Sequence, residues 1–172
     1  MAVYTKISKK DISYINRKFD IEKILEFKGI KQGIENTNYL LKSKNKKFIL
    51  TIFEKRVSKK ELPFFMNLMD KLNKSKINCP KPQTKKGGGY LINLKNKAAC
   101  IVSFLNGKDK KSLNFKNCYD IGKMIAEMHQ STKKMNLTRK NSMGVKNLNP
   151  LLKSIRFKSV SYTHLRAHET GI

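Results

Sequence analysis

The alternation of apolar and polar residues between positions 20 and 53 predicts three β-strands joined by short turns. The expected strands are Asp20–Lys28, Thr37–Leu41 and Phe48–Phe53. A loop with Gly29 and Gly33 connects the first two strands, and the charged segment Ser43–Lys47 forms a tight turn before the third. Glycines in such a loop have two interpretations. They form either a plain hairpin with a glycine bulge, or a backbone that approaches a ligand closely because no Cβ stands in the way.

An amphipathic helix is predicted over Ser58–Lys74, where apolar residues recur at helical spacing. These residues are Leu62, Phe65, Met66, Met69 and Leu72. Ser58 and Glu61 have the spacing of a capping box, in which each side chain accepts a hydrogen bond from the backbone N–H of the other residue. Pro63 favours a start somewhat later than that cap, because proline is best tolerated in the first turn of a helix.

A second pair of strands is predicted around a turn at Asn96. These strands are Tyr90–Leu94 and Ala98–Phe104. The proline-containing segment Asn78–Pro82 before them reads as an extended linker, and Ser8–Lys18 reads as a short helix capped by its first residue. Residues 1–105 are therefore expected to form an α+β lobe of about five antiparallel strands crossed by one helix.

The stretch Phe115–Ser131 predicts another helix, whose apolar residues lie on one face. They are Cys118, Ile121, Ile125 and Met128. This face needs a second hydrophobic layer that the edge of the sheet does not offer, so we interpret residues 106–158 as the start of a second, mostly helical lobe. His129, close to the end of the helix, is interpreted as a structural residue and not a catalytic one.

The composition changes at Ser159, because residues 159–172 contain no lysine and hold two of the three histidines. His164 and His168 have the spacing of a metal pair on a helix, but two ligands without a third make a poor site. The segment resembles the translated read-through of a sequencing-library adapter. We therefore expect residues 159–172 to be foreign to the protein, and we predict no metal site in the chain.

The formal net charge of +26 has two interpretations, a solvated lysine surface or a dedicated nucleic-acid face. Of the 38 basic residues, 33 are lysines, and they are scattered through every segment without interleaved aromatic residues. Such a surface binds polyanions weakly at low salt. We therefore expect no specific nucleic-acid partner.

Membrane and redox signals are weak in this sequence. It contains no apolar run of about 18 residues, and its first residues lack the apolar segment of a secretory signal. The cysteines are Cys79, Cys100 and Cys118, and they include no C-x-x-C pair. An odd number of unevenly spaced cysteines indicates reduced thiols, so we expect a cytoplasmic protein without a membrane partner.

Several stretches resemble the N-terminal part of homoserine kinases of the aminoglycoside-phosphotransferase-like, or choline-kinase-like, group. They are MAVYTKIS, FKGIKQGIENTNYLL, FILTIFEKR, ELPFFMNLMDKL, INCPKPQ, AACIVSFLNGK and IGKMIAEMHQS. They occur in the right order and with plausible spacing from Met1 to about Lys153. The run around Gly33 is more specific to this enzyme group than the general phosphotransferase pattern.

The resemblance implies a protein-kinase-like N-lobe that binds ATP, with Mg²⁺ held by ligands further along the chain. The γ-phosphoryl group would pass to the hydroxyl of homoserine, a small-molecule substrate on the path to threonine. The loop Gly29–Asn38 would cover the phosphates, and main-chain groups of Ser103–Leu105 would meet the adenine. The cofactor-binding candidates are Gly29, Gly33, Asn36, Asn38, Thr51, Lys55, Ser103, Phe104 and Leu105.

Two positions depart from the pattern of the family. Many relatives carry a lysine or arginine on the third strand, where this chain has Thr51, and we predict that Lys55 or Arg56 supplies the charge instead. A kinase-like fold also pairs a helix glutamate with that strand lysine. Glu61 is the available glutamate, and it has two interpretations: this pairing, or the capping of its own helix.

The His-x-Asp-x-x-x-x-Asn catalytic loop of the family does not occur in this sequence. We therefore predict no catalytic residue in the chain and no turnover of homoserine by these 172 residues alone. Two alternatives stay open: a small-molecule kinase of the same superfamily that acts on choline, a sugar or an aminoglycoside, and a small basic RNA-binding module. The sequence does not predict an oligomeric state.

Overall fold

The computed structural model describes residues 3–54, 58–133, 135–141 and 144–154. The chain divides after Leu137 into two compact units. The first holds every strand of the described chain, and the second contains the helix α4 (Val145–Ser154). The predicted foreign tail, with His164 and His168, lies outside the described residues.

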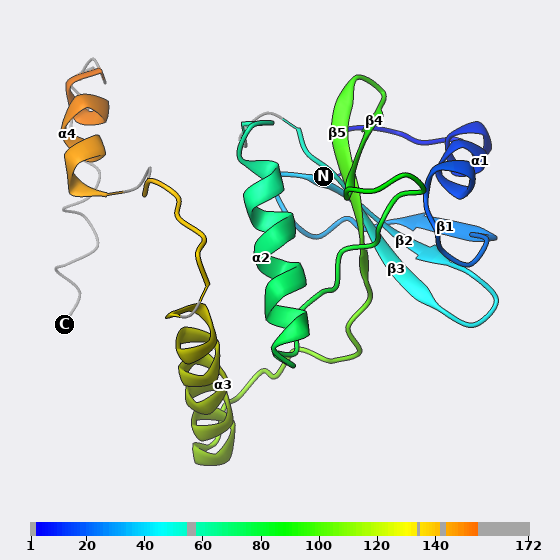
Figure 1. The fold of residues 1–172 in the computed structure, drawn as a ribbon. Helices are drawn as coiled ribbons and strands as arrows, with labels where there is room; N and C mark the ends of the chain where they lie inside the picture. Colours follow the sequence, from blue (N-terminus) through cyan, green and yellow to red (C-terminus); the bar gives the residue numbers. More distant parts are fainter. Residues whose placement is uncertain (1–2, 55–57, 134, 142–143, 155–172) are drawn as a thin grey trace, which may run out of the picture. The chain divides into compact units, whose positions relative to one another are not determined.

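Five strands form one antiparallel sheet in the order β1-β2-β3-β5-β4 (Figure 1). They are β1 (Glu26–Gly29), β2 (Thr37–Lys42), β3 (Lys47–Ile52), β4 (Leu91–Leu94) and β5 (Lys97–Ser103). The strands β2 to β5 match the sequence prediction within one residue at each end. The alternation of apolar residues is a reliable signal here because one face of each strand is buried in the core.

The first strand is shorter than predicted, because it begins at Glu26 and not at Asp20. Backbone N–H groups of the preceding segment donate to residues outside the sheet. The backbone N–H of Ile24 donates to Asn16 Oδ1 at 2.8 Å, and the N–H of Asp20 donates to Thr84 O at 3.2 Å. Phe19 and Ile24 are apolar because they enter the core from this loop, and their burial mimics the pattern of a strand.

The core lies between the sheet and the helix α1 (Lys9–Lys18). It is formed by Ile12, Ile15, Phe19, Ile24, Tyr39, Leu41, Phe48, Leu50, Ile52, Ile92, Leu94, Ala99 and Ile101. The predicted cap of α1 is confirmed, because Ser8 N–H donates to Asp11 Oδ2 at 2.8 Å and Asp11 N–H donates to Ser8 Oγ at 3.4 Å.

The second helix, α2 (Leu62–Lys74), lies on the other side of the sheet from α1 (Figure 1). The prediction that Ser58 caps it is wrong. The N-cap is Glu61, without a side-chain cap hydrogen bond, and Glu61 N–H instead donates to Ser58 O at 2.9 Å in a turn before the helix. Pro63 explains the late start, since it lacks an N–H and falls within the first two helical positions.

The helix α3 (Phe115–Lys133) confirms the helix predicted from Phe115. None of its residues is buried, and its apolar side chains are exposed to solvent. The large exposed ones are Phe115, Tyr119, Ile121, Met124 and Ile125. Among the described helices, none is long and apolar enough to cross a membrane.

The turn between β4 and β5 gives a first prediction. Lys95 and Asn96 both have positive φ, 52° and 61°, which is the conformation of a two-residue type I′ hairpin turn. Alanine is sterically less favourable than asparagine in this left-handed conformation. Asn96→Ala should therefore lower the free energy of unfolding by about 1 kcal/mol. Urea unfolding of this variant, with Asn106→Ala in an exposed loop as the control, measures the effect. Equal losses in the two variants would contradict the assignment to the turn.

Candidate functional site

The face of the sheet opposite the core carries the predicted site residues of the strands. Strand pairing places Asn38 beside Thr51, and Thr51 beside Cys100. Leu40 and Ile49 form the neighbouring pair on the same face. The side chains of β2 and β3 on this face are half-buried or exposed, whereas those on the opposite face of the sheet are nearly all buried. We call this face of β2 and β3 the open face.

The loop between β1 and β2 closes at its base with a hydrogen bond from Ile30 N–H to Asn38 O at 2.9 Å. Gly33 has a φ of +105°, and a Cβ at this position would meet no atom within 4 Å. Glycine is therefore required here by the backbone conformation and not by crowding. Gly29 differs, since a Cβ there would lie 3.0 Å from Val3 Cγ2. We call residues 29–36 the glycine loop.

Three of the predicted polar residues take part in hydrogen bonds between segments that are distant in the sequence. The Thr51 hydroxyl donates to Asn38 Oδ1 at 2.8 Å, so these two candidates form one neutral pair on the open face. Asn36 Oδ1 accepts a hydrogen bond from Glu54 N–H at 3.4 Å. The proposed substitutes for the missing strand lysine, Lys55 and Arg56, lie outside the described residues.

The segment after β5 contains the other three candidates. Ser103 N–H donates to Lys81 O at 2.8 Å, and Phe104 N–H donates to Lys47 O at 3.2 Å. The Lys47 ammonium lies 5.7 Å from the centroid of the Phe104 ring, within cation–π range. Leu105 is exposed, and the described chain gives its N–H no hydrogen-bond partner. Of these three backbone N–H groups, that of Leu105 is the one without a partner among the described residues.

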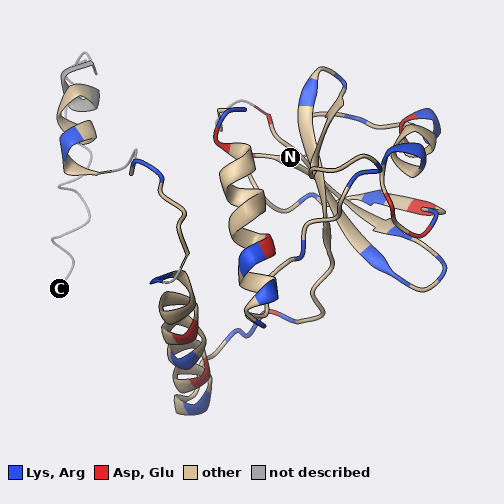
Figure 2. Ribbon diagram, in the orientation of Figure 1, with Lys and Arg blue, Asp and Glu red and all other residues tan. Residues whose placement is uncertain are grey.

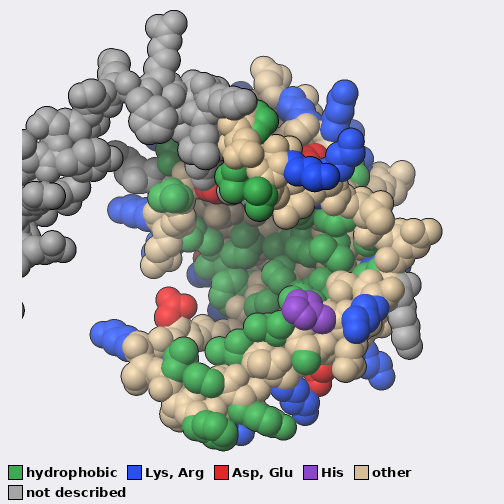
Figure 3. Space-filling model, turned by 90° about the vertical axis from the view of Figure 1, so that its left-hand side faces the viewer, with side chains coloured by type: hydrophobic (Ala, Val, Ile, Leu, Met, Phe, Trp, Pro, Cys, Tyr) green, Lys and Arg blue, Asp and Glu red, His purple; other side chains and the backbone are tan. Residues whose placement is uncertain are grey.

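A cavity of about 430 Å³ adjoins the glycine loop. It is lined by Lys28, Gly29, Ile30, Lys31, Gln32 and Leu40. A second cavity of about 400 Å³ shares Lys28 and Leu40 with it and extends over β1. Hydrophobic side chains line a hollow on the side of the molecule shown in Figure 3. A larger cavity of about 810 Å³ lies at the C-terminal ends of α2 and α3, and no predicted site residue lines it.

The charged residues of the described chain do not gather on one element. Lysines and arginines occur on helices, strands and loops (Figure 2). At the glycine loop, Lys28 and Lys31 give the adjoining cavity two cationic side chains. These positive charges suit a ligand with phosphate groups.

A polar cluster that the sequence analysis missed joins the ends of three strands. Glu54 accepts hydrogen bonds from Thr5 Oγ1 at 2.7 Å and Thr37 Oγ1 at 2.6 Å, and it forms an ion pair with Lys97. Burial favours a raised pKa for the Glu54 carboxyl, but the hydrogen bonds from Lys97, Thr37 and Thr5 outweigh it and hold the pKa below its ordinary value. The signal in the sequence was that Thr5, Thr37 and Glu54 belong to three of the family-like stretches.

The described residues contain no group of three histidine, cysteine, aspartate or glutamate side chains that could hold a metal ion. The predicted Mg²⁺ therefore has no fitting site in this part of the chain.

Residues 26–165 match the profile described as the phosphotransferase enzyme family. The chain belongs to this family. It is 40% identical over 156 residues to a homoserine kinase of Paramagnetospirillum magneticum, which corresponds to 91% of this chain and 48% of the relative. It is 37% identical over 145 residues to a homoserine kinase of Rhizobium etli, which corresponds to 84% and 45%. The chain thus spans about half the length of the curated relatives it matches.

Two solved structures of phosphotransferases share the fold. Spectinomycin phosphotransferase in complex with ADP and spectinomycin aligns with a TM-score of 0.60 at 15% identity, over 74% of this chain and 39% of that one. The microcompartment-associated aminopropanol kinase aligns with a TM-score of 0.62 at 12% identity, over 82% and 48%. The predicted α+β fold, a kinase-like N-lobe followed by helices, is confirmed by these alignments and by the five-stranded sheet.

Proposed function

We propose that this member of the phosphotransferase family is the ATP-binding part of a homoserine kinase. The observation that carries the proposal is the 40% identity to a homoserine kinase over 156 residues, together with the open glycine loop beside a cationic cavity. The whole enzyme would transfer the γ-phosphoryl group of ATP to the homoserine hydroxyl, a step toward threonine in the cytoplasm. The ADP bound to spectinomycin phosphotransferase, which shares the fold, supports ATP as the nucleotide.

The residues of this chain would bind and orient the nucleotide. The backbone of the glycine loop would cover the phosphates, with Lys28 and Lys31 as nearby cations. The N–H of Leu105, which has no hydrogen-bond partner among the described residues, would donate to the adenine. The Asn38–Thr51 pair would offer neutral hydrogen-bonding groups where many relatives carry a strand lysine. Transfer of this kind depends mainly on positioning and on charge stabilisation.

We assign residues 1–105 to the nucleotide lobe, 106–158 to the start of a helical lobe and 159–172 to the tail of foreign origin. The exposed apolar side chains of α3 support this division, because a helix at the start of a lobe needs partners that the described residues do not provide. No residue of the chain is assigned to catalysis, since the His-x-Asp-x-x-x-x-Asn loop does not occur in it.

Nucleotide binding by the 172-residue chain tests the first half of the proposal. A fluorescent ATP analogue displaced by ATP gives the Kd, and Gly33→Ala should raise it about tenfold because its φ of +105° strains any L side chain. Gly122→Ala is the matched control, since a Cβ there meets no atom within 4 Å and its φ is not positive. Failure of the unaltered chain to bind ATP, or equal Kd values for both variants, would contradict the assignment of the loop.

Homoserine specificity needs a complete enzyme. Residues 1–153 can be joined to the remaining half of the Paramagnetospirillum magneticum relative, and ADP release measured with homoserine, choline or spectinomycin as the acceptor. We expect release with homoserine only, and none from the 172-residue chain alone. Release with another acceptor, or turnover by the chain alone, would overturn the corresponding part of the proposal.

A further inference from the structure

The first residues of the chain contact the glycine loop at two points. The hydroxyl of Tyr4 donates a hydrogen bond to Ile34 O, at the exposed end of the loop, at 3.0 Å. Val3 packs against Gly29, at the start of the loop, so closely that a Cβ there would lie 3.0 Å from Val3 Cγ2. We call residues 3–7 the N-terminal strap. These contacts join residues about 30 positions apart in the sequence.

The strap is itself fixed to the sheet through buried groups. The Thr37 hydroxyl accepts hydrogen bonds from the N–H groups of Tyr4 and Thr5, at 3.0 and 3.1 Å. The Tyr39 hydroxyl donates to Thr5 O at 3.0 Å and accepts from Ile7 N–H at 3.3 Å. Thr37 is fully buried, so its three hydrogen bonds have no competing water.

The Glu54 carboxylate also fixes the strap to the sheet. Glu54 accepts hydrogen bonds from the hydroxyls of both Thr5 and Thr37, and Lys97 Nζ donates to Thr5 Oγ1 at 2.7 Å. The strap is therefore anchored to residues at the ends of β2, β3 and β5, while Tyr4 reaches from it to the loop. An anchored donor at the end of an exposed loop restricts the conformations that the loop can adopt.

We propose that the N-terminal strap positions the glycine loop, and that Tyr4 is a positioning residue for nucleotide binding. The Tyr4 side chain is largely exposed, so its hydroxyl contributes little to the core and acts mainly through Ile34 O. Gly29 fits this role, because a Cβ at this position would lie 3.0 Å from Val3 Cγ2 and would push that part of the strap away by a few tenths of an ångström. The effect on nucleotide affinity rests on the function proposed above, whereas the effect on the loop does not.

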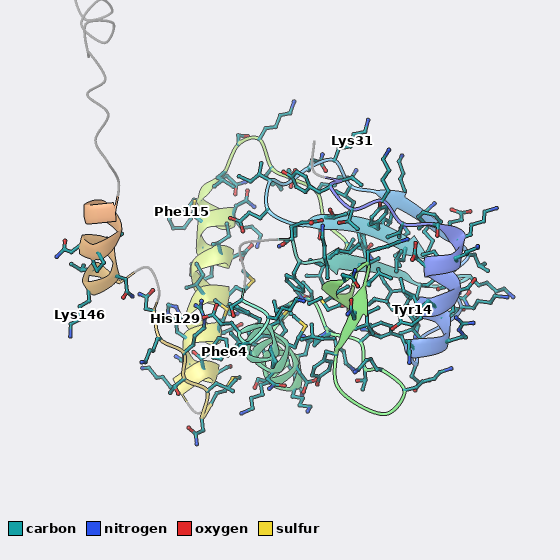
Figure 4. The ribbon with its side chains drawn as sticks, turned by 90° about the horizontal axis from the view of Figure 1, so that it is seen from above. Tyr14, Lys31, Phe64, Phe115, His129 and Lys146 are labelled. Carbon is teal, nitrogen blue, oxygen red and sulfur yellow. The ribbon has the colours of Figure 1, made fainter. Side chains whose placement is uncertain are left out.

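Tyr4→Phe tests the proposal because it removes a single hydroxyl group. Tyr14→Phe is the matched control, since Tyr14 is on α1, well separated from Lys31 of the glycine loop (Figure 4). Backbone ¹⁵N relaxation of the 172-residue chain reports on loop order, and ATP displacement reports on binding. We expect the order parameters of residues 31–35 to fall below about 0.6 in Tyr4→Phe only, with an unchanged melting temperature. The loss of one hydrogen bond should raise the Kd for ATP about fivefold.

The outcomes separate the two proposals. Unchanged order parameters in Tyr4→Phe would overturn the positioning role, whether or not ATP binds. Ordered loops that become mobile in Tyr4→Phe, in a chain that does not bind ATP, would support the strap and contradict the nucleotide function. A clear fall in the melting temperature of Tyr4→Phe that accompanies the rise in Kd would show a merely structural role. This result would overturn the assignment of Tyr4.

A second pair of substitutions tests the Val3 contact. Gly29→Ala should displace the strap and lower the loop order parameters, and Val3→Ala in the same chain should restore them, because it removes the methyl groups that the new Cβ meets. Coupling of the two changes supports the proposal. Independent effects of the two changes would overturn the view that Gly29 is required by the strap.

Discussion

Replacement of Leu50 by alanine is expected to lower the free energy of unfolding by about 3–5 kcal/mol. Leu50 is 0% exposed and lies on the central strand β3, paired with Tyr39 on one side and Ile101 on the other. Truncation removes buried methyl groups and leaves a cavity that the sheet on both sides prevents from collapsing. The loss is a large part of the stability of a small domain, so the variant should unfold at a markedly lower urea concentration.

Leu25→Ala is the control for this prediction, because it makes the same chemical change at a side chain that is 63% exposed. Leu25 holds its place through a backbone hydrogen bond from its N–H to Lys42 O at 2.8 Å, which alanine retains. We expect a change of less than about 1 kcal/mol for this variant in urea unfolding followed by circular dichroism. Similar losses in both variants would contradict the position of Leu50 in the core.

Local sequence patterns predicted most of the fold, because each strand has one buried face. Alternation over β2 and β3 follows directly from the burial of Thr37, Tyr39 and Leu41 and the partial exposure of the residues between them. The pattern failed at residues 20–25, where Ile24 is buried in a loop and its N–H bonds to Asn16. A hydrophobic residue shows that a position is buried, but not which hydrogen bonds its backbone makes.

The candidate site was less predictable than the fold. The sequence predicted a loop from its glycines and asparagines, but it did not predict the residues that these groups contact. The Thr51–Asn38 hydrogen bond joins two strands, and the Tyr4–Ile34 hydrogen bond joins residues 30 positions apart. The Glu54–Lys97 pair spans 43 positions and has no local signature. Such contacts depend on the strand order, which places the end of β3 beside the start of β5.

The second large effect is expected when the Glu54 carboxylate is removed. Glu54→Gln should lower the free energy of unfolding at about pH 7 by about 3 kcal/mol, because the charge of Lys97 then loses its partner. The side chain of Glu54 is 10% exposed and that of Lys97 is 36% exposed, so the loss lies at the low end of the range for buried pairs. Urea unfolding of both chains at several pH values measures it.

The pH dependence of this loss has a definite sign. Glu54 has a pKa below its ordinary value of 4.5 in the folded chain, so it binds protons more readily when the chain is unfolded. Its contribution to stability is therefore complete above about pH 5 and declines as the pH falls through 4.5 and then through the folded pKa. The difference between the unaltered chain and Glu54→Gln should accordingly narrow on acidification.

Glu26→Gln separates this effect from a general loss of charge. Glu26 also pairs with a lysine, Lys42 at 3.0 Å, but its side chain is 69% exposed, and an exposed pair contributes less than about 1 kcal/mol. Asp11→Asn is a second comparison, for the pH dependence. Burial favours a raised pKa for the Asp11 carboxyl too, but hydrogen bonds from Ser8 and Lys95 hold that pKa below its ordinary value. A stability difference for Glu54→Gln that stays constant from neutral to acidic pH would show that the carboxyl has the same pKa in the folded and the unfolded chain. The charge of Glu54 would then contribute nothing to the anchoring of the N-terminal strap.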